Sequence, residues 1–264
     1  MSKKWSPILS VLLIIAAFAI GSMWTKIQFL QSGQPAGGSG AVVNTQQPAA
    51  VANVPKTDKP NVELFVMSYC PFGLQTQKAM VSAVELLGNK INFQPRWVSY
   101  AMHGQKEVEE NLRQFCIAKE QPEKYLSYLR CFVTANDTAD CQNKAGLDMA
   151  KLNTCFTGSD NQFGIMKAFN DKASWISGQY PKFAIDEPLN TKYSVRGSPT
   201  LVINGVTVNA ARSANELKSL ICSAFKNPPG ECQKNLTTSQ EAPGAGAIGL
   251  AYNPPAGGGT GGCQ

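Results

Sequence analysis

The feature that most constrains the fold is an apolar segment that runs directly into a cysteine–proline pair and then into a helical pattern. Residues 61–67 are rich in apolar and β-branched side chains, as expected of a buried strand. The turn at residues 68–73 follows at once and contains Cys70 and Pro71, with proline in the position that it favours at a helix start. Apolar residues then recur at helical spacing: Met80, Val81, Val84 and Leu87. The sequence therefore predicts a strand, a turn and a helix whose first turn carries a cysteine.

The rest of the chain supplies the elements of an α/β fold. A second strand, a helical region, a hairpin and a last helix follow in order, at residues 91–99, about 106–176, 200–208 and 213–225. Pro95 bends the second strand or places it at a sheet edge, and Asn204-Gly205 is a strong two-residue hairpin signal. Without the helical region, the order is the βαβ…ββα order of a thioredoxin fold. We predict an α/β, thioredoxin-like fold with a helical insertion at about residues 100–190.

Composition divides the chain into four parts. No charged side chain occurs between Gln31 and Pro55, and 8 of the 23 glycines lie after Pro243. A segment of 177 residues between these regions is long enough for one domain with a sizeable core. The predicted parts are an N-terminal segment, a flexible linker, the domain and a disordered Gly/Ala/Pro-rich tail: residues 1–30, 31–58, 59–235 and 236–264.

The N-terminal segment predicts export. Lys3 and Lys4 precede 18 uncharged residues, which as a helix would span roughly 27 Å, close to the thickness of a hydrocarbon core. We expect a transmembrane anchor with the two lysines in the cytoplasm and the domain on the extracytoplasmic side. A cleaved signal peptide is the alternative, and the protein would then be secreted.

The eight cysteines fit an exported domain, because disulfides persist outside the cytoplasm. Six of them lie in the body of the domain and none forms a C-x-x-C pair, so structural disulfides are favoured over a zinc site or free core cysteines. Fifteen pairings of these six are possible. The spacing favours three: Cys131–Cys141, Cys116–Cys155 and Cys222–Cys232.

Other functional classes are disfavoured. A single histidine argues against multi-histidine metal sites and a Ser-His-Asp hydrolase, and we predict no metal and no cofactor. The net charge of +6 and the absence of long Lys/Arg runs disfavour a nucleic-acid partner. No phosphate loop or dinucleotide fingerprint occurs.

Cys70 is the candidate catalytic residue. At a helix N-terminus a thiol faces unpaired backbone N–H groups and the positive end of the helix dipole, and both favour the reactive thiolate. Gly197-Ser198-Pro199-Thr200 precedes the hairpin, and in a thioredoxin fold that proline is cis and lies beside the active cysteine, while the preceding residue pairs with an incoming peptide. The competing interpretations are an inert Cys70 and an ordinary trans proline opening an edge strand.

A longer pattern gives a family resemblance. His103, Gly104, Glu107, Asn111 and Cys116 match, in register, the signature C-Q-H-G-x-x-E-C-x-x-N-x-x-x-x-C of the gamma-interferon-inducible lysosomal thiol reductases (GILT). Ala101 and Val108 replace the first two signature cysteines, and Met102 departs as well. Over about residues 61–232 the chain thus resembles this family, whose chemistry rests on cysteine thiols. We expect His103, Glu107 and Asn111 to have structural roles.

The chain departs from that family at the active turn. The family carries C-x-x-C, whereas this chain reads Cys70-Pro71-Phe72-Gly73, so the second thiol is missing from the helix. Three ways to complete exchange remain open. An external thiol resolves the mixed disulfide, which we rank first; Cys263 reaches back as a resolving thiol; or the domain binds thiol partners without turnover.

The sequence therefore predicts extracytoplasmic thiol–disulfide exchange through Cys70. The expected partners are thiol- or disulfide-bearing extracytoplasmic proteins, a low-molecular-weight thiol or redox partner, and the membrane through the N-terminal helix. The predicted substrate-binding residues are Phe72, Ser198, Pro199 and Thr200. The alternative is a non-enzymatic peptide-binding or assembly module of the cell envelope.

Overall fold

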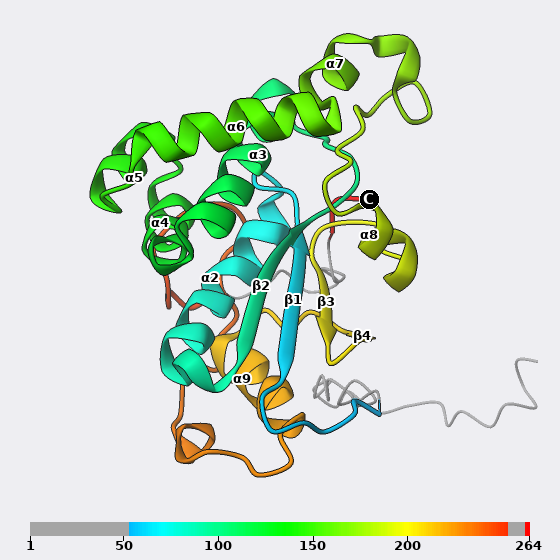
Figure 1. The fold of residues 1–264 in the computed structure, drawn as a ribbon. Helices are drawn as coiled ribbons and strands as arrows, with labels where there is room; N and C mark the ends of the chain where they lie inside the picture. Colours follow the sequence, from blue (N-terminus) through cyan, green and yellow to red (C-terminus); the bar gives the residue numbers. More distant parts are fainter. Residues whose placement is uncertain (1–52, 253–261) are drawn as a thin grey trace, which may run out of the picture. The chain divides into compact units, whose positions relative to one another are not determined.

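Within the part of the chain that the structure describes, four strands form a sheet in the order β2-β1-β3-β4 (Figure 1). The structure is a computed structural model and describes residues 53–252 and 262–264. β1 (Asn61–Val66) is parallel to β2 (Asn92–Trp97) and antiparallel to β3 (Thr200–Ile203), which is antiparallel to β4 (Val206–Val208). A parallel β–α–β unit joined to an antiparallel hairpin is the topology of a thioredoxin-like fold, as the order of elements predicts.

Two sequence signals explain the edges and the turn of this sheet. Pro95 lies in β2 opposite Leu64, and β2 is an edge strand, where the missing N–H of proline leaves no ladder bond unmade. Asn204 and Gly205 connect β3 to β4 with φ values of 48° and 82°. Both angles lie in the left-handed region that a tight hairpin turn of this kind requires.

Helices connect and cover the strands. α2 (Pro71–Leu87) joins β1 to β2, and α9 (Ala214–Ser223) follows the hairpin. The chain between β2 and β3 contains six helices: α3 (Gln105–Glu120), α4 (Pro122–Ala135), α5 (Thr138–Lys144), α6 (Met149–Phe163), α7 (Ile165–Asn170) and α8 (Glu187–Tyr193). Short 3-10 turns occur at Gly88–Lys90 (η1), Lys172–Ser174 (η2) and Gly230–Gln233 (η3).

Alternate residues of β1 contribute to two hydrophobic clusters. Val62 and Leu64 belong to a cluster with side chains of α2 and α9, including Met80. Phe65, together with Met67 directly after β1, belongs to a second cluster that includes Tyr193 of α8. Successive side chains of a strand point to opposite faces, so α2 with α9 and α8 cover the two faces of the sheet.

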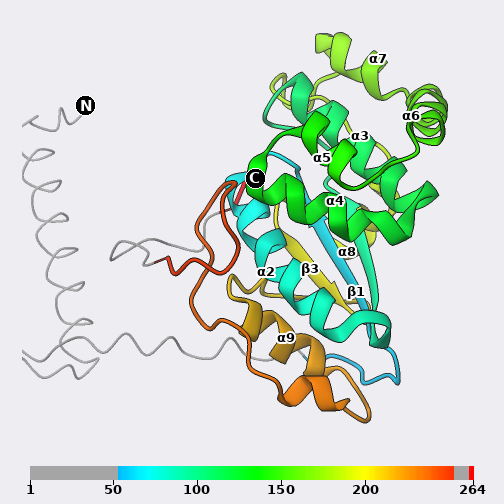
Figure 2. The same ribbon diagram turned by 90° about the vertical axis from the view of Figure 1, so that its left-hand side faces the viewer.

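Helix α4 of the insertion packs beside α2 (Figure 2). Tyr128 and Phe132 of α4 are fully buried in a cluster that includes Leu74 and Val81 of α2. The insertion therefore shares a core with the helix that starts at Cys70.

Four disulfides connect these elements. Cys116–Cys155 joins α3 to α6, Cys131–Cys141 joins α4 to α5, and Cys222–Cys232 joins α9 to the following 3-10 turn; the fourth is Cys70–Cys263. In the chain-entropy model, a disulfide that closes a loop of about 10–15 residues stabilises the folded state by about 3 kcal/mol.

Residues 236–252 differ from the disordered tail that their composition predicts. Gly244 N–H donates to the Pro71 carbonyl at 2.8 Å, and Gly246 N–H donates to the Val133 carbonyl at 3.0 Å. Glu241 N–H donates to a third carbonyl, that of Arg212, at 3.0 Å. Backbone hydrogen bonds therefore hold this segment against the domain, although it has few apolar side chains of its own.

The predicted N-terminal anchor or signal peptide lies outside the described residues, as does most of the linker. The last residues of the predicted linker are described and belong to the domain: Thr57 N–H donates to the Ala224 carbonyl at 2.9 Å, and Lys226 N–H donates to the Thr57 carbonyl at 2.8 Å. In residues 53–252 and 262–264, no helix combines the length and the apolar composition that a membrane span needs.

A buried lysine lies on α2. Lys78 is fully buried, and its Nζ has no hydrogen-bond partner among the described residues. Burial lowers the pKa of Lys78 below its usual 10.5, and the charge of Glu241 opposes that change. Glu241 is itself 1% exposed, and burial raises the pKa of its carboxyl group.

We predict that Lys78→Met raises the free energy of unfolding by about 1–2 kcal/mol at pH 7, because a desolvated ammonium group is removed. The native pKa lies below the unfolded value, so this unfavourable contribution is complete below the native pKa and disappears as the pH rises toward 10.5. Urea unfolding at several pH values between 7 and 10 should therefore show the gain shrinking as the pH rises. Lys151→Met, at an exposed helix position, is the control, and a destabilised Lys78→Met protein at pH 7 would contradict the prediction.

Candidate active site

The turn between β1 and α2 is held by side chains of α3. Ser68 N–H donates to Asn111 Oδ1 at 2.9 Å, and Tyr69 N–H donates to Glu107 Oε2 at 3.1 Å. Cys70 N–H then donates to the Met67 carbonyl at 3.0 Å. Hydrogen bonds thus fix the backbone N–H of each of the three residues that lead into α2.

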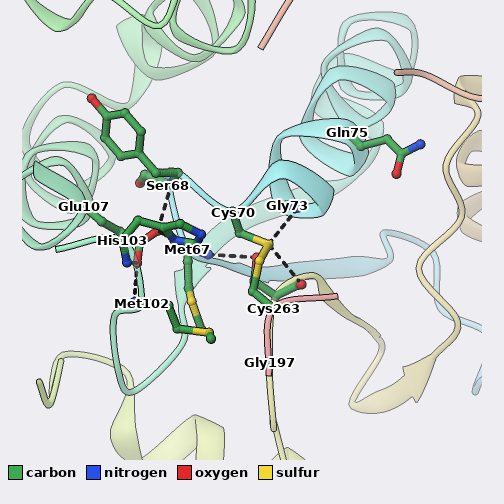
Figure 3. Close-up of a disulfide and its surroundings, with 12 residues drawn as sticks. Met67, Ser68, Cys70, Gly73, Gln75, Met102, His103, Glu107, Gly197 and Cys263 are labelled. Atoms are coloured by element: carbon green, nitrogen blue, oxygen red, sulfur yellow. Dashed lines mark hydrogen bonds and ion pairs between the residues drawn. A yellow bond between two sulfur atoms is a disulfide. The ribbon is translucent and has the colours of Figure 1, made fainter. Parts of the chain in front are cut away.

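Glu107 is the centre of this polar network. Its carboxylate is fully buried and also accepts the backbone N–H groups of Met102 at 2.7 Å and His103 at 3.1 Å. The His103 ring completes the set, with Nδ1 2.6 Å from Glu107 Oε2 (Figure 3). Three of the positions that match the GILT signature, His103, Glu107 and Asn111, therefore meet beneath the turn before Cys70, where Glu107 and Asn111 orient its backbone.

Cys70 is the N-cap residue of α2. Its Sγ accepts a hydrogen bond from Gly73 N–H at 3.4 Å, and Pro71 occupies the first turn of the helix. The side chain is fully buried. A negative charge on Sγ at this position would be favoured by the unpaired N–H groups and the dipole of a 17-residue helix.

Ser198 lies directly against this helix start. The Ser198–Pro199 peptide bond is cis, and the Ser198 carbonyl oxygen is 3.4 Å from Cys70 Sγ. Met67 N–H donates to Ser198 Oγ at 3.0 Å. Thr200 Oγ1 donates to the Gly197 carbonyl at 2.8 Å, which closes the loop that precedes β3.

The end of the chain occupies the space in front of Cys70. Cys263 is bonded to Cys70 (Figure 3). The Cys263 backbone forms two antiparallel hydrogen bonds with Ser198, both of 2.9 Å. Ser198 N–H donates to the Cys263 carbonyl, and Cys263 N–H donates to the Ser198 carbonyl. The terminal segment thus lies as a short strand along the loop that contains Pro199.

Two tyrosines border the site as neutral phenols. Burial, and after it the nearby carboxylate of Glu110, raises the pKa of Tyr69 above its usual 10.0. Burial likewise raises the pKa of Tyr100, whose hydroxyl donates to the Arg196 carbonyl at 2.6 Å.

The structure brings together most of the residues that the sequence singles out. Cys70, Ser198, Pro199 and Cys263 meet at one point. Phe72 lies in the hydrophobic cluster around Cys70, and its ring centroid is 5.4 Å from the Arg212 guanidinium carbon. The other six cysteines lie elsewhere, in their own disulfides. Among the described residues, a group of possible metal ligands forms around Cys131, Cys141 and Asp140, but both sulfur atoms are bonded to each other.

Gly197 is a site residue that the sequence does not single out. A side-chain β-carbon there would overlap the Cys263 carbonyl oxygen and approach Gln264 Cγ to 2.7 Å. The glycine is visible in the stretch Gly197-Ser198-Pro199-Thr200. The sequence does not indicate, however, which segment fills the space that a side chain at position 197 would take.

Comparisons with known proteins give structural similarity without sequence support. No protein-family model matches the chain, and no curated protein sequence does. Among solved structures, the chain is similar to the reduced form of the disulfide bond oxidoreductase DsbG from Mycobacterium tuberculosis, with a TM-score of 0.46 at 14% identity over 67% of this chain and 88% of that one. Oxidised DsbA from the same organism gives a TM-score of 0.48 at 14% identity, over 67% of this chain and 94% of that one. Oxidised BdbD from Bacillus subtilis gives a TM-score of 0.45 at 16% identity, also over 67% of this chain and 94% of that one. The fold assignment rests on the strand order, and the function is inferred from the site.

We predict that Gly73→Ala destabilises the protein by about 1–2 kcal/mol, because the new β-carbon would lie 2.5 Å from Ser198 Oγ. Moving that hydroxyl group would leave Met67 N–H without an acceptor, which outweighs the better helix propensity of alanine. A double-mutant cycle by urea unfolding checks this. In a Ser198→Ala background, Gly73→Ala should no longer destabilise; equal effects in both backgrounds would contradict the contact.

We also predict that Glu107→Gln lowers the free energy of unfolding by about 2–4 kcal/mol, since an amide group cannot accept all the N–H groups that converge on the carboxylate. Urea unfolding of Glu107→Gln against Glu120→Gln, an exposed position on the same helix, measures the effect. A loss as small as that of the control would show that the network does not hold the turn.

Proposed function

We propose that this protein carries out thiol–disulfide exchange on extracytoplasmic proteins through Cys70, with Cys263 as the second thiol of the pair. The observation that carries the proposal is the Cys70–Cys263 disulfide, seated by strand pairing against Ser198 at the N-terminus of α2. This arrangement favours Cys263 over the external resolving thiol that the sequence analysis ranked first. An external redox partner is still needed to restore the pair after turnover.

The exchange follows from the positions of the two sulfur atoms. A substrate thiolate attacks Cys70 Sγ, the Cys70–Cys263 bond breaks, and Cys263 leaves as a thiolate that takes up a proton. A second substrate thiolate then attacks the substrate sulfur of the mixed disulfide, and Cys70 leaves as a thiolate. The products are a substrate disulfide and the Cys70/Cys263 dithiol, which the disulfide of a redox partner reoxidises. The same steps in reverse reduce a substrate.

The groups around Cys70 suit these steps. The Gly73 N–H and the N-terminus of α2 favour negative charge on Cys70 Sγ when it leaves. Phe72 provides an apolar surface beside the sulfur, while Ser198 provides backbone groups for the incoming chain. Four disulfides fit an oxidising compartment, in agreement with the predicted export. The predicted membrane anchor and the resemblance to the GILT family stay predictions.

Two observations favour the alternative, a non-enzymatic peptide-binding or assembly module of the cell envelope. Cys70 is fully buried, and the terminal segment occupies the position of a bound peptide. In that function the Cys70–Cys263 bond would fix the tail permanently.

Exchange with a reduced dithiol peptide distinguishes the two functions. We expect the oxidised full-length protein to oxidise the peptide, Cys70→Ser to lose at least about 99% of the rate, and Cys263→Ser to accumulate a mixed disulfide at Cys70 in the presence of an external disulfide. Mass spectrometry of acid-quenched samples identifies the species. The double variant Cys131→Ser/Cys141→Ser removes a remote disulfide and should keep the rate within about twofold.

A wild-type protein that binds the peptide with no loss of thiols would support the binding module instead. Full activity in Cys70→Ser would exclude Cys70 as the exchanging residue, whatever the behaviour of Cys263.

A further inference from the structure

The terminal segment is held in front of Cys70 by contacts that another peptide can reproduce. Apart from the disulfide, Cys263 is fixed through its backbone, which exchanges both hydrogen bonds with Ser198. Such antiparallel pairing depends little on the side chains of the added strand. The segment 262–264 therefore indicates how the backbone of a cysteine-containing peptide fits beside Cys70.

The fit restricts the residue that precedes the cysteine. Residue 262 is a glycine, and a β-carbon there would lie 3.3 Å from the Ser198 carbonyl oxygen. That oxygen accepts the Cys263 N–H and lies 3.4 Å from Cys70 Sγ, so moving it away from a side chain at position 262 would lengthen both contacts. Glycine fits this position without displacing the loop, whereas a side chain requires the loop to give by a few tenths of an ångström.

The fit also depends on Gly197, which faces the chain after the cysteine. The three nearest atoms that a β-carbon at Gly197 would meet all belong to Cys263 and Gln264. By contrast, those nearest a β-carbon at Gly73 belong to Ser198, Met67 and Cys70, within the domain. The absence of a side chain at Gly197 thus makes room for the docked peptide.

We propose that the site selects extended protein segments in which the reactive cysteine follows a glycine, and that Gly197 is the specificity-determining residue that admits them. The segment 262–264 is the protein's own example of such a substrate and must leave before another can bind. This inference rests on the proposed function, since it takes Cys70 as the exchanging thiol.

The test uses full-length, reduced Cys263→Ser protein, so that Cys70 is the thiol at the site. Its probes are the peptides Gly-Gly-Cys-Gln and Gly-Val-Cys-Gln, each with its cysteine in a disulfide to 5-thio-2-nitrobenzoate. The Cys70 thiolate attacks the peptide sulfur, the peptide–nitrobenzoate disulfide breaks, and the coloured thiolate leaves with the electron pair. The symmetrical small disulfide 5,5′-dithiobis(2-nitrobenzoate) reacts in the same way without a peptide backbone.

We expect the glycine peptide to react about tenfold faster than the valine peptide, each rate being divided by that of the small disulfide. Adding Gly197→Ala should lower the normalised rate of the glycine peptide by about tenfold, because the paired backbone no longer fits. The small disulfide should react at least as fast as before, since the added methyl group also displaces the segment 262–264.

Gly158→Ala is the matched control, because a β-carbon there meets no atom within 4 Å. Urea unfolding of each variant establishes that the domain is folded. Equal normalised rates for the two peptides, or an unchanged rate for Gly197→Ala, would overturn the specificity while the small disulfide still reports a reactive Cys70. If Cys70 reacted with none of the three probes, the proposed function itself would fail, and this inference with it.

Discussion

The position of Ser198 is the constraint on which the site depends. Its backbone N–H and carbonyl pair with Cys263, and its hydroxyl oxygen accepts the Met67 N–H at the end of β1. The residue is 1% exposed, so its hydrogen bonds are shielded from competing water. Ser198 thereby connects the end of β1, the start of α2 and the end of the chain, and the location of Cys70 Sγ follows from these contacts.

The helical insertion supports the same site from the other side. Glu107 lies in the first turn of α3, where the helix dipole favours its negative charge, and its carboxylate accepts N–H groups from the turn before Cys70. Buried charges are tolerated when they are fully hydrogen-bonded, and Glu107 meets that condition with Tyr69, Met102 and His103. The insertion therefore fixes the backbone of the active turn as well as adding to the core.

What could be predicted from the sequence is mostly local. The strand, turn and helix around Cys70 and the hairpin at Asn204-Gly205 depend on neighbouring residues, so their patterns are visible in the chain and the thioredoxin-like topology follows from their order. The packing of residues 236–252 was not predictable, because it depends on backbone N–H groups that meet distant carbonyls and leave no mark on composition.

Contacts between residues far apart in the sequence explain the other differences. Cys70 and Cys263 are separated by 193 residues, and over that distance loop length gives almost no preference for one pairing over another. The role of Gly197 was not predictable either, because it depends on the distant residues Cys263 and Gln264, which fill the space that a side chain would take.

The two glycines at the site decide from which segment a second thiol can approach Cys70. A side chain at position 73 would collide with Ser198 Oγ, whose hydrogen bond holds β1, so the helix has no room for a second cysteine in this arrangement. At position 197 the missing side chain leaves room for a strand that brings Cys263 to Cys70. In the proposed function, a substrate and the tail then compete for the same two backbone hydrogen bonds. The tail is part of the chain and has an effective concentration of up to about millimolar, as tethered segments do. A substrate backbone can therefore pair with Ser198 only once attack on Cys70 Sγ has released Cys263, and the return of the tail helps to release the product.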